Sequence, residues 1–431
     1  MYDPIKKKQV QDWLVKEGHG YCSMPYTHMA VESNGDVRPC CVGKPFKDLN
    51  INNKSIGETF NHHTRQKFVE TFNQNKKSSL CNACWVDSSK FSNRVKFSTM
   101  PETLEQTYKA MQGDDEGRQQ HLKWLEIKPG NRCNLKCRIC GIHNSSQWTK
   151  ETYEYRFDRG LTDKKFKDSR EFKYTSSCDW VDNDGFWQDI NSFKEISTIH
   201  FMGGEPFMVP EHFKMLQAII DSDIDANEIT IRYNTNGTYF PTLKQLKIWR
   251  HFKKIKLSLS IDDIGERFEY QRKLAVWKEV KENLKKYCKL RYHYAKNGSN
   301  VEPLLDPTVS IFNIWHIDKI EKGFNNLGYS ISSEQKHFAS HGNFDPRILP
   351  QPIKDKLIKK YEYHTHWQHN IAQFLRTKNP NKSDTIEKML SSIFYFDNAR
   401  KENFYHHNKE LYNEIKYYYG SKGSNLKGLI K

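Results

Sequence analysis

Three cysteines in the middle of the chain have a spacing that can hold a reactive metal cluster. Cys133, Cys137 and Cys140 form the pattern Cys-x3-Cys-x2-Cys, here called the cysteine loop, and follow a strand-like run at 124–128. A cubane iron–sulfur cluster has four irons, so three thiolates leave one iron open for an exogenous ligand. Open coordination is typical of catalytic metal sites. From these residues alone, part of a zinc site or scattered core thiols are the alternatives.

Four more cysteines near the N-terminus provide a complete ligand set for a second metal site. Two short apolar runs joined through Asn34 and Gly35 are typical of a β-hairpin. The hairpin would bring Cys22 near Cys40, and a Cys-x2-Cys knuckle follows. The resulting cysteine tetrad is Cys22, Cys40, Cys81 and Cys84, with Cys41 as an alternative to Cys40. Zinc is the usual metal for such a tetrad in a cytosolic protein, and a four-iron cluster is the alternative.

The composition is that of a globular protein large enough for two or three domains. The 431 residues are 36% hydrophobic and 13% aromatic, and no apolar run reaches the length of a membrane span. Residues 1–8 lack the apolar core of a signal peptide, so we expect a cytoplasmic protein with reduced cysteines and no membrane partner. The net charge of +16 could indicate a nucleic-acid partner. The basic residues are spread along the chain, however, and the composition of an AT-rich genome explains them better.

From Trp124 onward, the sequence alternates between strand-like and helix-like segments. Predicted strands at 196–202, 229–234, 255–261 and 308–314 are separated by predicted helices at 210–220, 241–252 and 274–287. This alternation predicts an α/β fold whose parallel sheet curls toward a barrel. In the 255–262 run, Ser258, Ser260 and Asp262 would point inward, which indicates a polar cavity near the carboxyl ends of the strands.

The rest of the sequence divides the chain into three predicted parts. We expect a small cysteine-rich α+β domain at 1–115, a barrel domain at 116–345 with an insertion at 156–185, and a helical C-terminal extension at 346–431. In the extension, the spacing of apolar residues predicts helices at 353–363, 384–393 and 408–419. Cys178 and Cys288 have no partners at ligand spacing and are interpreted as ordinary thiols.

The cysteine loop and a second motif, Gly203-Gly-Glu-Pro206, together resemble the radical S-adenosylmethionine (SAM) superfamily. Asn234-Thr-Asn-Gly237 is also similar to that superfamily, as is Ser260-Ile-Asp262 followed by Arg272. The four motifs occur in the same order as in the superfamily and cover about residues 120–345. The resemblance implies an α/β fold of the partial (β/α)6 TIM-like barrel type.

The cysteine tetrad resembles the twitch domain, which is a shortened SPASM domain. Residues 55–61 are similar to the helix that lies between the cysteines of that domain. In that family the four cysteines hold an auxiliary [4Fe-4S] cluster, which favours iron over zinc here. The order is unusual, because this domain generally follows the barrel and here it precedes it. The reversed order is similar to that in proteins of bacterial viruses, which would act in the host cytoplasm.

The resemblance assigns roles to residues near the cysteine loop. Its three cysteines would hold a [4Fe-4S] cluster whose open iron binds the amino and carboxylate groups of SAM. One-electron reduction of SAM would then release a 5′-deoxyadenosyl radical that abstracts a substrate hydrogen. A guanidinium at Arg272 could bind the SAM carboxylate in bidentate fashion. The other implied contacts to SAM are Gly203, Gly204, Glu205 and Pro206 for the methionyl amine, and Asn234 and Ser260 for ribose or carboxylate.

The tetrad also limits the type of reaction that we expect. A cluster with four cysteine ligands has no vacant iron, so its expected role is to accept an electron from the substrate radical in a net oxidation. The resemblance favours a peptide or protein side chain as substrate, with an external one-electron donor such as flavodoxin or ferredoxin. The alternatives are dehydrogenation of a sugar or aminocyclitol and modification of a nucleotide or nucleic acid. The competing class is a non-enzymatic, basic, zinc-binding interaction module.

Overall fold

The structure is a computed structural model of the whole chain. It describes residues 3–16, 20–85, 92–160, 162–169, 171–176, 179–297, 300–331, 337–339, 343–379 and 385–421. Among these residues, no helix is both long enough and apolar enough to cross a lipid bilayer.

A seven-stranded sheet in the order β2-β1-β3-β5-β6-β7-β9 forms the centre of the molecule. All neighbouring strands in it are parallel except the β1/β2 hairpin. Two short strands, β4 and β8, form a separate antiparallel pair. The strands are β1 (His28–Val31), β2 (Val37–Arg38), β3 (Trp124–Ile127), β4 (Lys136–Cys137), β5 (Thr198–Phe201), β6 (Thr230–Thr235), β7 (Lys254–Leu259), β8 (Arg272–Lys273) and β9 (Val301–Leu305).

The helices form three groups along the chain. The N-terminal group is α1 (Pro4–Lys16), α2 (Met24–Thr27), α3 (Ile56–Phe60), α4 (His63–Asn73), α5 (Asn82–Trp85), α6 (Asn93–Ser98) and α7 (Pro101–Met111). The middle group is α8 (Thr149–Phe157), α9 (Asp163–Lys167), α10 (Lys173–Ser176), α11 (Asp184–Gln188), α12 (Glu211–Ile220), α13 (Leu243–Trp249), α14 (Gly265–Gln271), α15 (Trp277–Asn297) and α16 (Ile317–Asn325). The C-terminal group is α17 (Gln351–Tyr361), α18 (His366–Arg376), α19 (Ile386–Arg400), α20 (Phe404–His407) and α21 (Lys409–Ser421).

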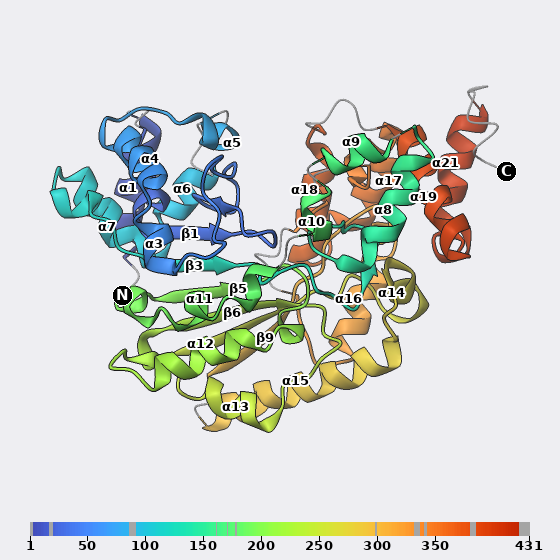
Figure 1. Cartoon of the computed structure of the whole chain (residues 1–431). Coiled ribbons are helices and arrows are strands. Elements are labelled where there is room, and N and C mark those ends of the chain that lie inside the picture. The colour runs from blue at the N-terminus through green and yellow to red at the C-terminus, as the bar shows by residue number, and fades with distance from the viewer. Residues whose placement is uncertain are drawn as a thin grey trace.

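The two faces of the sheet differ in polarity because alternate side chains of a strand point to opposite faces. In β6 and β7, every second residue is buried and the residues between are partly exposed. The buried set packs against α12, α13 and α15, with Tyr233 stacked between Phe201 and Phe207. These helices cover one side of the sheet in Figure 1. The predicted alternation of Ser258 with Leu257 and Leu259 is therefore present.

The N-terminal hairpin belongs to the same sheet as the barrel strands. β1 pairs in parallel with the whole of β3, from His28 opposite Trp124 to Val31 opposite Ile127. The hairpin turn needs Gly35, whose φ of +81° lies in the left-handed region. The segment at 124–305 thus supplies five parallel strands and the N-terminal segment supplies a sixth. The predicted partial barrel is confirmed, as an open sheet without closure.

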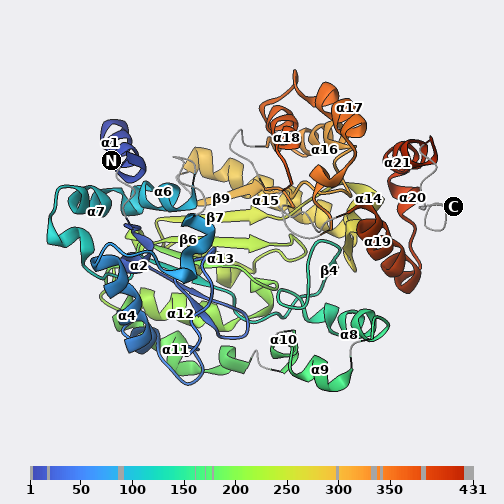
Figure 2. The same cartoon turned by 90° about the horizontal axis from the view of Figure 1, so that it is seen from above.

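The N-terminal and C-terminal helices lie at opposite ends of the strands. Figure 1 places the N-terminal group near the amino ends of β1 and β3, and the C-terminal group near the carboxyl ends. The view from above in Figure 2 gives the same arrangement, with the sheet between the two groups. The carboxyl ends of the parallel strands, where α/β folds bind their ligands, therefore face the C-terminal helices.

The predicted strand at 308–314 is wrong, because the last strand of the sheet is β9. Residues 311–315 form a turn instead, and the Asn313 amide closes it by donating to the backbone oxygens of Asp262 and Thr308 (both 2.9 Å). The alternating apolar residues here are buried in a turn, which gives the same pattern as a strand. Pro303 weakened the strand signal of β9, yet a proline is tolerated there because β9 is an edge strand.

A variant lacking residues 1–119 tests whether β1 is integral to the sheet. Its removal would leave all four residues of β3 as an unpaired edge and expose the apolar surface under the hairpin. We expect this variant to aggregate and to lose cooperative thermal unfolding, as measured by size-exclusion chromatography and circular dichroism. A monomeric variant with a sharp unfolding transition would show instead that the barrel segment folds by itself.

Candidate active site

The cysteine loop follows the carboxyl end of β3 and is held by local hydrogen bonds. β4, inside the loop, pairs with β8 so that Cys137 lies opposite Arg272. Cys133 and Cys137 are only 8% and 9% exposed, and Cys140 is partly exposed. The backbone N–H of Leu135 donates to the Cys133 sulfur at 3.4 Å. The three thiols lie close enough to interact electrostatically, since Cys133 and Cys137 both help to raise the pKa of Cys140.

The surroundings of these thiols fit a metal cluster. Arg272 Nη1 lies 3.8 Å from the Cys137 sulfur, and Asn236 Nδ2 lies 3.9 Å from the Cys133 sulfur. Burial, with a contribution from the neighbouring thiols, raises the pKa of Cys133 to about 11 and that of Cys140 to about 12. Thiols of this kind remain protonated at neutral pH until a metal displaces the protons. Nearby N–H donors would stabilise the resulting negative charge on sulfur.

The Gly203–Pro206 segment, here called the GGEP loop, packs directly against the residues before the cysteine loop. A Cβ on Gly204 would lie 2.2 Å from the backbone oxygen of Arg132, and Gly203 has a φ of +105°. The Glu205 N–H donates to the same Arg132 oxygen at 2.8 Å. Both glycines are therefore required for this close approach of two backbones.

The Glu205 side chain connects the ends of β5 and β6. It is buried and accepts hydrogen bonds from Thr235 Oγ1 and from the backbone N–H of Asn236, both at 2.8 Å. Burial raises the pKa of this carboxyl to about 7, against the effect of these hydrogen bonds. Because the carboxylate already has these partners, the backbone of the GGEP loop is the part that remains for contact with a ligand amine.

The other predicted SAM contacts, Arg272, Ser260 and Asn234, are each held by hydrogen bonds within the protein. Arg272 forms an ion pair with Asp262, with Nε and Nη2 at 2.9 and 2.8 Å from the same carboxylate oxygen. One edge of its guanidinium is therefore occupied, and Nη1 faces the cysteine loop. The Ser260 backbone is bound to β6 through its N–H. Asn234 lies on the polar face of β6 and is hydrogen-bonded to His200 Nε2 at 2.9 Å.

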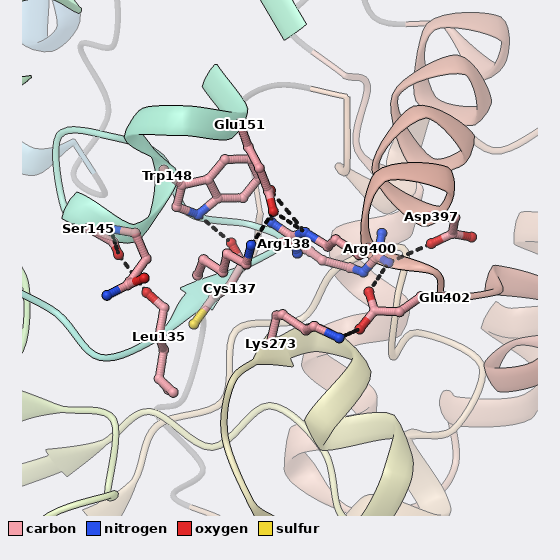
Figure 3. Close-up of polar contacts among 12 residues, drawn as sticks. Leu135, Cys137, Arg138, Ser145, Trp148, Glu151, Lys273, Asp397, Arg400 and Glu402 are labelled. Atoms are coloured by element: carbon pink, nitrogen blue, oxygen red, sulfur yellow. Dashed lines mark hydrogen bonds and ion pairs between the residues drawn. The ribbon is translucent and has the colours of Figure 1, made fainter. Parts of the chain in front are cut away.

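A buried arginine inside the cysteine loop binds the C-terminal extension. Arg138 is 3% exposed, and its Nη2 lies 2.5 Å from Asp397 and 2.6 Å from Glu402. Its guanidinium also lies 3.8 Å from the centre of the Tyr270 ring. Figure 3 shows the two carboxylates reaching Arg138 from the end of α19 and the segment after it, with Lys273 on the far side of Glu402.

A second buried ion pair holds the loop from its other side. Glu151 on α8 accepts hydrogen bonds from two nitrogens of Arg400, at 3.0 and 2.7 Å, and forms an ion pair with Lys136. Arg400 lies over the ring of Trp148, whose indole N–H donates to the Cys137 backbone oxygen at 3.1 Å. Figure 3 shows the contacts among Glu151, Arg400, Trp148 and Cys137. The end of α19 thus contacts the residues on both sides of Cys137, Arg138 directly through Asp397 and Lys136 through Arg400 and Glu151.

Sequence reasoning did not find these ion pairs. The partners of Arg138 lie 259 and 264 residues away along the chain, so no spacing pattern connects them. The only signal available was an arginine between two cysteine ligands, where burial would demand a carboxylate partner.

Among the remaining cysteines, Cys288 is buried on α15. Cys178 lies outside the described residues.

The four cysteines of the tetrad line one pocket in the N-terminal segment. Apolar residues, among them Met24 and Phe68, form the rest of its wall. Backbone N–H groups of Val42 and Gly43 face the Cys40 sulfur. The Arg94 guanidinium also lines the pocket. Four thiols with N–H donors and a cation fit an anionic, fully cysteine-ligated cluster.

Cys41 lies outside this pocket, although it follows Cys40 directly. Its side chain is exposed, whereas Cys40 is buried against Met24 and Trp124. Trp124 is the first residue of β3, and the cysteine loop follows the last. The tetrad and the cysteine loop therefore lie beyond opposite ends of a four-residue strand, which spans roughly 10 Å.

Gly204→Ala tests the contact between the GGEP loop and the cysteine loop. The new methyl group would overlap a backbone oxygen, which cannot move without displacing the loop. After anaerobic reconstitution, we expect the Gly204→Ala variant to hold about four irons per chain instead of about eight, because only the tetrad would keep its cluster. Gly420→Ala is the matched control, since a Cβ there has open space. A full iron content in Gly204→Ala would contradict the proposed packing.

Asp397→Asn tests the ion pair between α19 and the cysteine loop. Removing one negative charge near the loop should make its cluster easier to reduce, raising the reduction potential by tens of millivolts. The measurement is a redox titration followed by electron paramagnetic resonance, with thermal unfolding measured in parallel. Asp355→Asn, on the exposed face of α17, removes the same charge elsewhere and should leave the potential unchanged. Equal shifts in the two variants would contradict a local effect.

Comparisons with known proteins agree with the two cysteine-containing sites. Residues 127–301 match the family model of the radical SAM superfamily, and residues 22–85 match the SPASM model, described as an iron-sulfur cluster-binding domain. No curated protein sequence matches the chain. Similar solved structures include native anSMEcpe with bound AdoMet (19% identity, TM-score 0.36, 59% of this chain and 64% of that chain). Another is native anSMEcpe with bound AdoMet and Kp18Cys peptide (20% identity, TM-score 0.35, 59% and 63%).

The matched part spans less than two thirds of the length of these structures. The first family match begins at the last residue of β3 and includes the cysteine loop, and the second begins at Cys22 and ends just after Cys84. A radical SAM domain implies SAM and a [4Fe-4S] cluster, and a SPASM domain implies an auxiliary iron–sulfur cluster. The chain therefore contains a radical SAM domain, and a SPASM-type iron–sulfur cluster-binding domain precedes it.

Proposed function

We propose that this chain is a radical SAM enzyme that carries out a net oxidation of a peptide or protein side chain. The observation that carries the proposal is a cavity of about 800 Å³ beside the cysteine loop, into which all three parts of the chain contribute residues. Cavities of this size hold a drug-sized ligand. Cys140 lies in one wall, so a substrate there would be next to the SAM-binding cluster.

The walls of the cavity come from distant segments. The N-terminal hairpin supplies Glu32 and Arg38, and the segment at 156–185, predicted to be an insertion, supplies Glu171 and Tyr174. The C-terminal helix α19 supplies Phe396. The SPASM-type domain thus forms part of the same substrate cavity as the radical SAM domain, which supports a shared reaction at that place.

The polarity of the cavity supports a peptide as substrate. Glu32 is nearly buried and lies between two cations, 2.8 Å from Arg38 and 2.9 Å from Lys128. Such groups can exchange partners with the amide and charged groups of a peptide. Aromatic side chains, including Tyr155 and Phe396, provide apolar area for its side chains.

The residues around the cysteine loop would position SAM for the reaction. With its cluster and SAM bound, a radical SAM domain supplies a 5′-deoxyadenosyl radical that abstracts a hydrogen atom from the substrate. The GGEP loop offers backbone oxygens to the methionyl amine, because its two glycines allow close approach. Arg272 presents Nη1 toward the same region. The buried walls around Cys133 and Cys137 exclude water from the reactive centre.

The position of the tetrad supports electron transfer away from the substrate. Its four cysteines leave no ligand position open, so the cluster it holds would exchange electrons and not bind substrate. Cys40 packs on Trp124, and β3 leads from there directly to the cysteine loop. An external one-electron donor, of the flavodoxin or ferredoxin type, would reduce the cluster of the cysteine loop.

Cysteine variants test whether the cysteine loop cleaves SAM and the tetrad serves the oxidation of the substrate. Replacing all three cysteines of the cysteine loop by Ala should abolish 5′-deoxyadenosine formation and lower iron from about eight to about four per chain. Cys40→Ala should keep 5′-deoxyadenosine formation and lose the oxidised product. The neighbouring Cys41→Ala should resemble the parent, and iron loss in Cys41→Ala but not in Cys40→Ala would contradict the assigned tetrad.

The same assay discriminates between substrate classes. A peptide mixture should accelerate 5′-deoxyadenosine formation and yield peptides that have lost a pair of hydrogens, as detected by mass spectrometry. Acceleration by nucleotides or aminocyclitols, with no effect of peptides, would overturn the peptide proposal while leaving the radical SAM reaction in place.

A further inference from the structure

A second large cavity lies apart from the cysteine loop, between α14, α15, α16 and the α20–α21 corner. Its volume is about 930 Å³, and none of its lining residues belongs to the cysteine loop or the tetrad. We propose that this cavity binds a phosphorylated small molecule. The proposal goes beyond the oxidation reaction proposed above and does not depend on it.

The charge of the cavity favours a polyanion. Its cations exceed its carboxylates, and they come from four different helices. The lining cations are Arg267, Lys281, Lys285, Lys319 and Lys409, and the lining carboxylates are Glu266 and Glu410.

Part of this positive charge has no nearby counter-charge. Lys319 lies 3.5 Å from Glu410, and Lys285 lies 2.7 Å from Glu282. Arg267 is paired with the buried Asp263. Among the residues that the structure describes, Lys281 and Lys409 have no carboxylate within ion-pair distance. A cavity with unpaired cations on separate helices is suited to a group that accepts several donors at once, as a phosphate does.

A buried histidine in the cavity wall points independently to a ligand. His316 is 2% exposed, and neither of its ring nitrogens has a hydrogen-bond partner. The nearest carboxylate oxygen, on Glu410, is 3.9 Å from Nε2, too far for a hydrogen bond. A buried polar group without a hydrogen-bond partner is unfavourable, because its lost hydration is not replaced. Both ring nitrogens are covered by neighbouring atoms, so a bound phosphate oxygen would accept a hydrogen bond from the imidazole N–H once the ring turns toward the cavity.

An apolar side of the cavity indicates that the ligand also has an organic part. Ile264, Trp277 and Leu327 line it, and Trp277 is only partly buried. The volume is at the upper end of the range for small-molecule sites. Inorganic phosphate alone would leave most of this space empty, so a phosphate ester with a planar or apolar group fits better.

Calorimetric titration of the full-length, reconstituted protein with inorganic pyrophosphate and with adenosine diphosphate tests the proposal. We expect both to bind, with adenosine diphosphate at least tenfold tighter because it can also contact Trp277. The combined Lys281→Gln, Lys319→Gln and Lys409→Gln variant should weaken both by tenfold or more. The matched control is Lys244→Gln, Lys247→Gln and Lys253→Gln, which removes the same charge elsewhere and should change binding less than twofold.

His316→Phe separates a site from a general charge effect. It retains every cation but removes the ring N–H, so it should weaken pyrophosphate binding at least fivefold, with thermal unfolding measured to verify the fold. Equal weakening in both lysine variants, or no pyrophosphate binding by the parent, would overturn the proposal. A single-stranded oligonucleotide that binds through the same lysines far more tightly than adenosine diphosphate would also overturn it, in favour of a nucleic-acid surface.

Discussion

The buried guanidinium of Arg138 is the interaction on which the geometry of the cysteine loop depends. It lies between two of the loop's cysteines and is neutralised by Asp397 and Glu402, which belong to the C-terminal extension. Breaking a buried ion pair by removing one partner typically costs 3–5 kcal/mol, because the remaining charge stays buried. Buried ion pairs that are costly to break therefore fix the C-terminal extension to the cysteine loop.

One helix, α19, links this ion pair to the cavity that we propose as the substrate site. The last turns of α19 hold the loop through Asp397 and Arg400, while Ser392 and Phe396 on the same helix line the 800 Å³ cavity. A substrate that shifts α19 would also shift the partners of Arg138. Substrate contact and cluster environment are thus coupled through a rigid element with buried charges at its end.

Much of this architecture could be predicted from local sequence patterns. The Asn34–Gly35 turn and the alternation in residues 255–261 are short-range signals that predicted their elements, and the two family matches contain the cysteines that the spacings indicated. Where prediction failed, the cause was non-local. Residues 308–314 have a strand-like pattern but are buried in a turn, and the pairing of β1 with β3 leaves no trace in either segment. The Arg138 ion pair joins residues more than 250 positions apart, so only the folded chain brings it together.

The parallel pairing of β1 with β3 has a consequence for the order of assembly. His28 lies opposite Trp124, which is 96 positions further along the chain, so the hairpin and the tetrad, complete at Cys84, are synthesised before the strand that pairs with β1. Closing so long a loop is slow compared with forming the hairpin itself. The hairpin can therefore form before β3 is synthesised, whereas the ion pairs of Arg138 that fix the cysteine loop need residues more than 250 positions further along the chain.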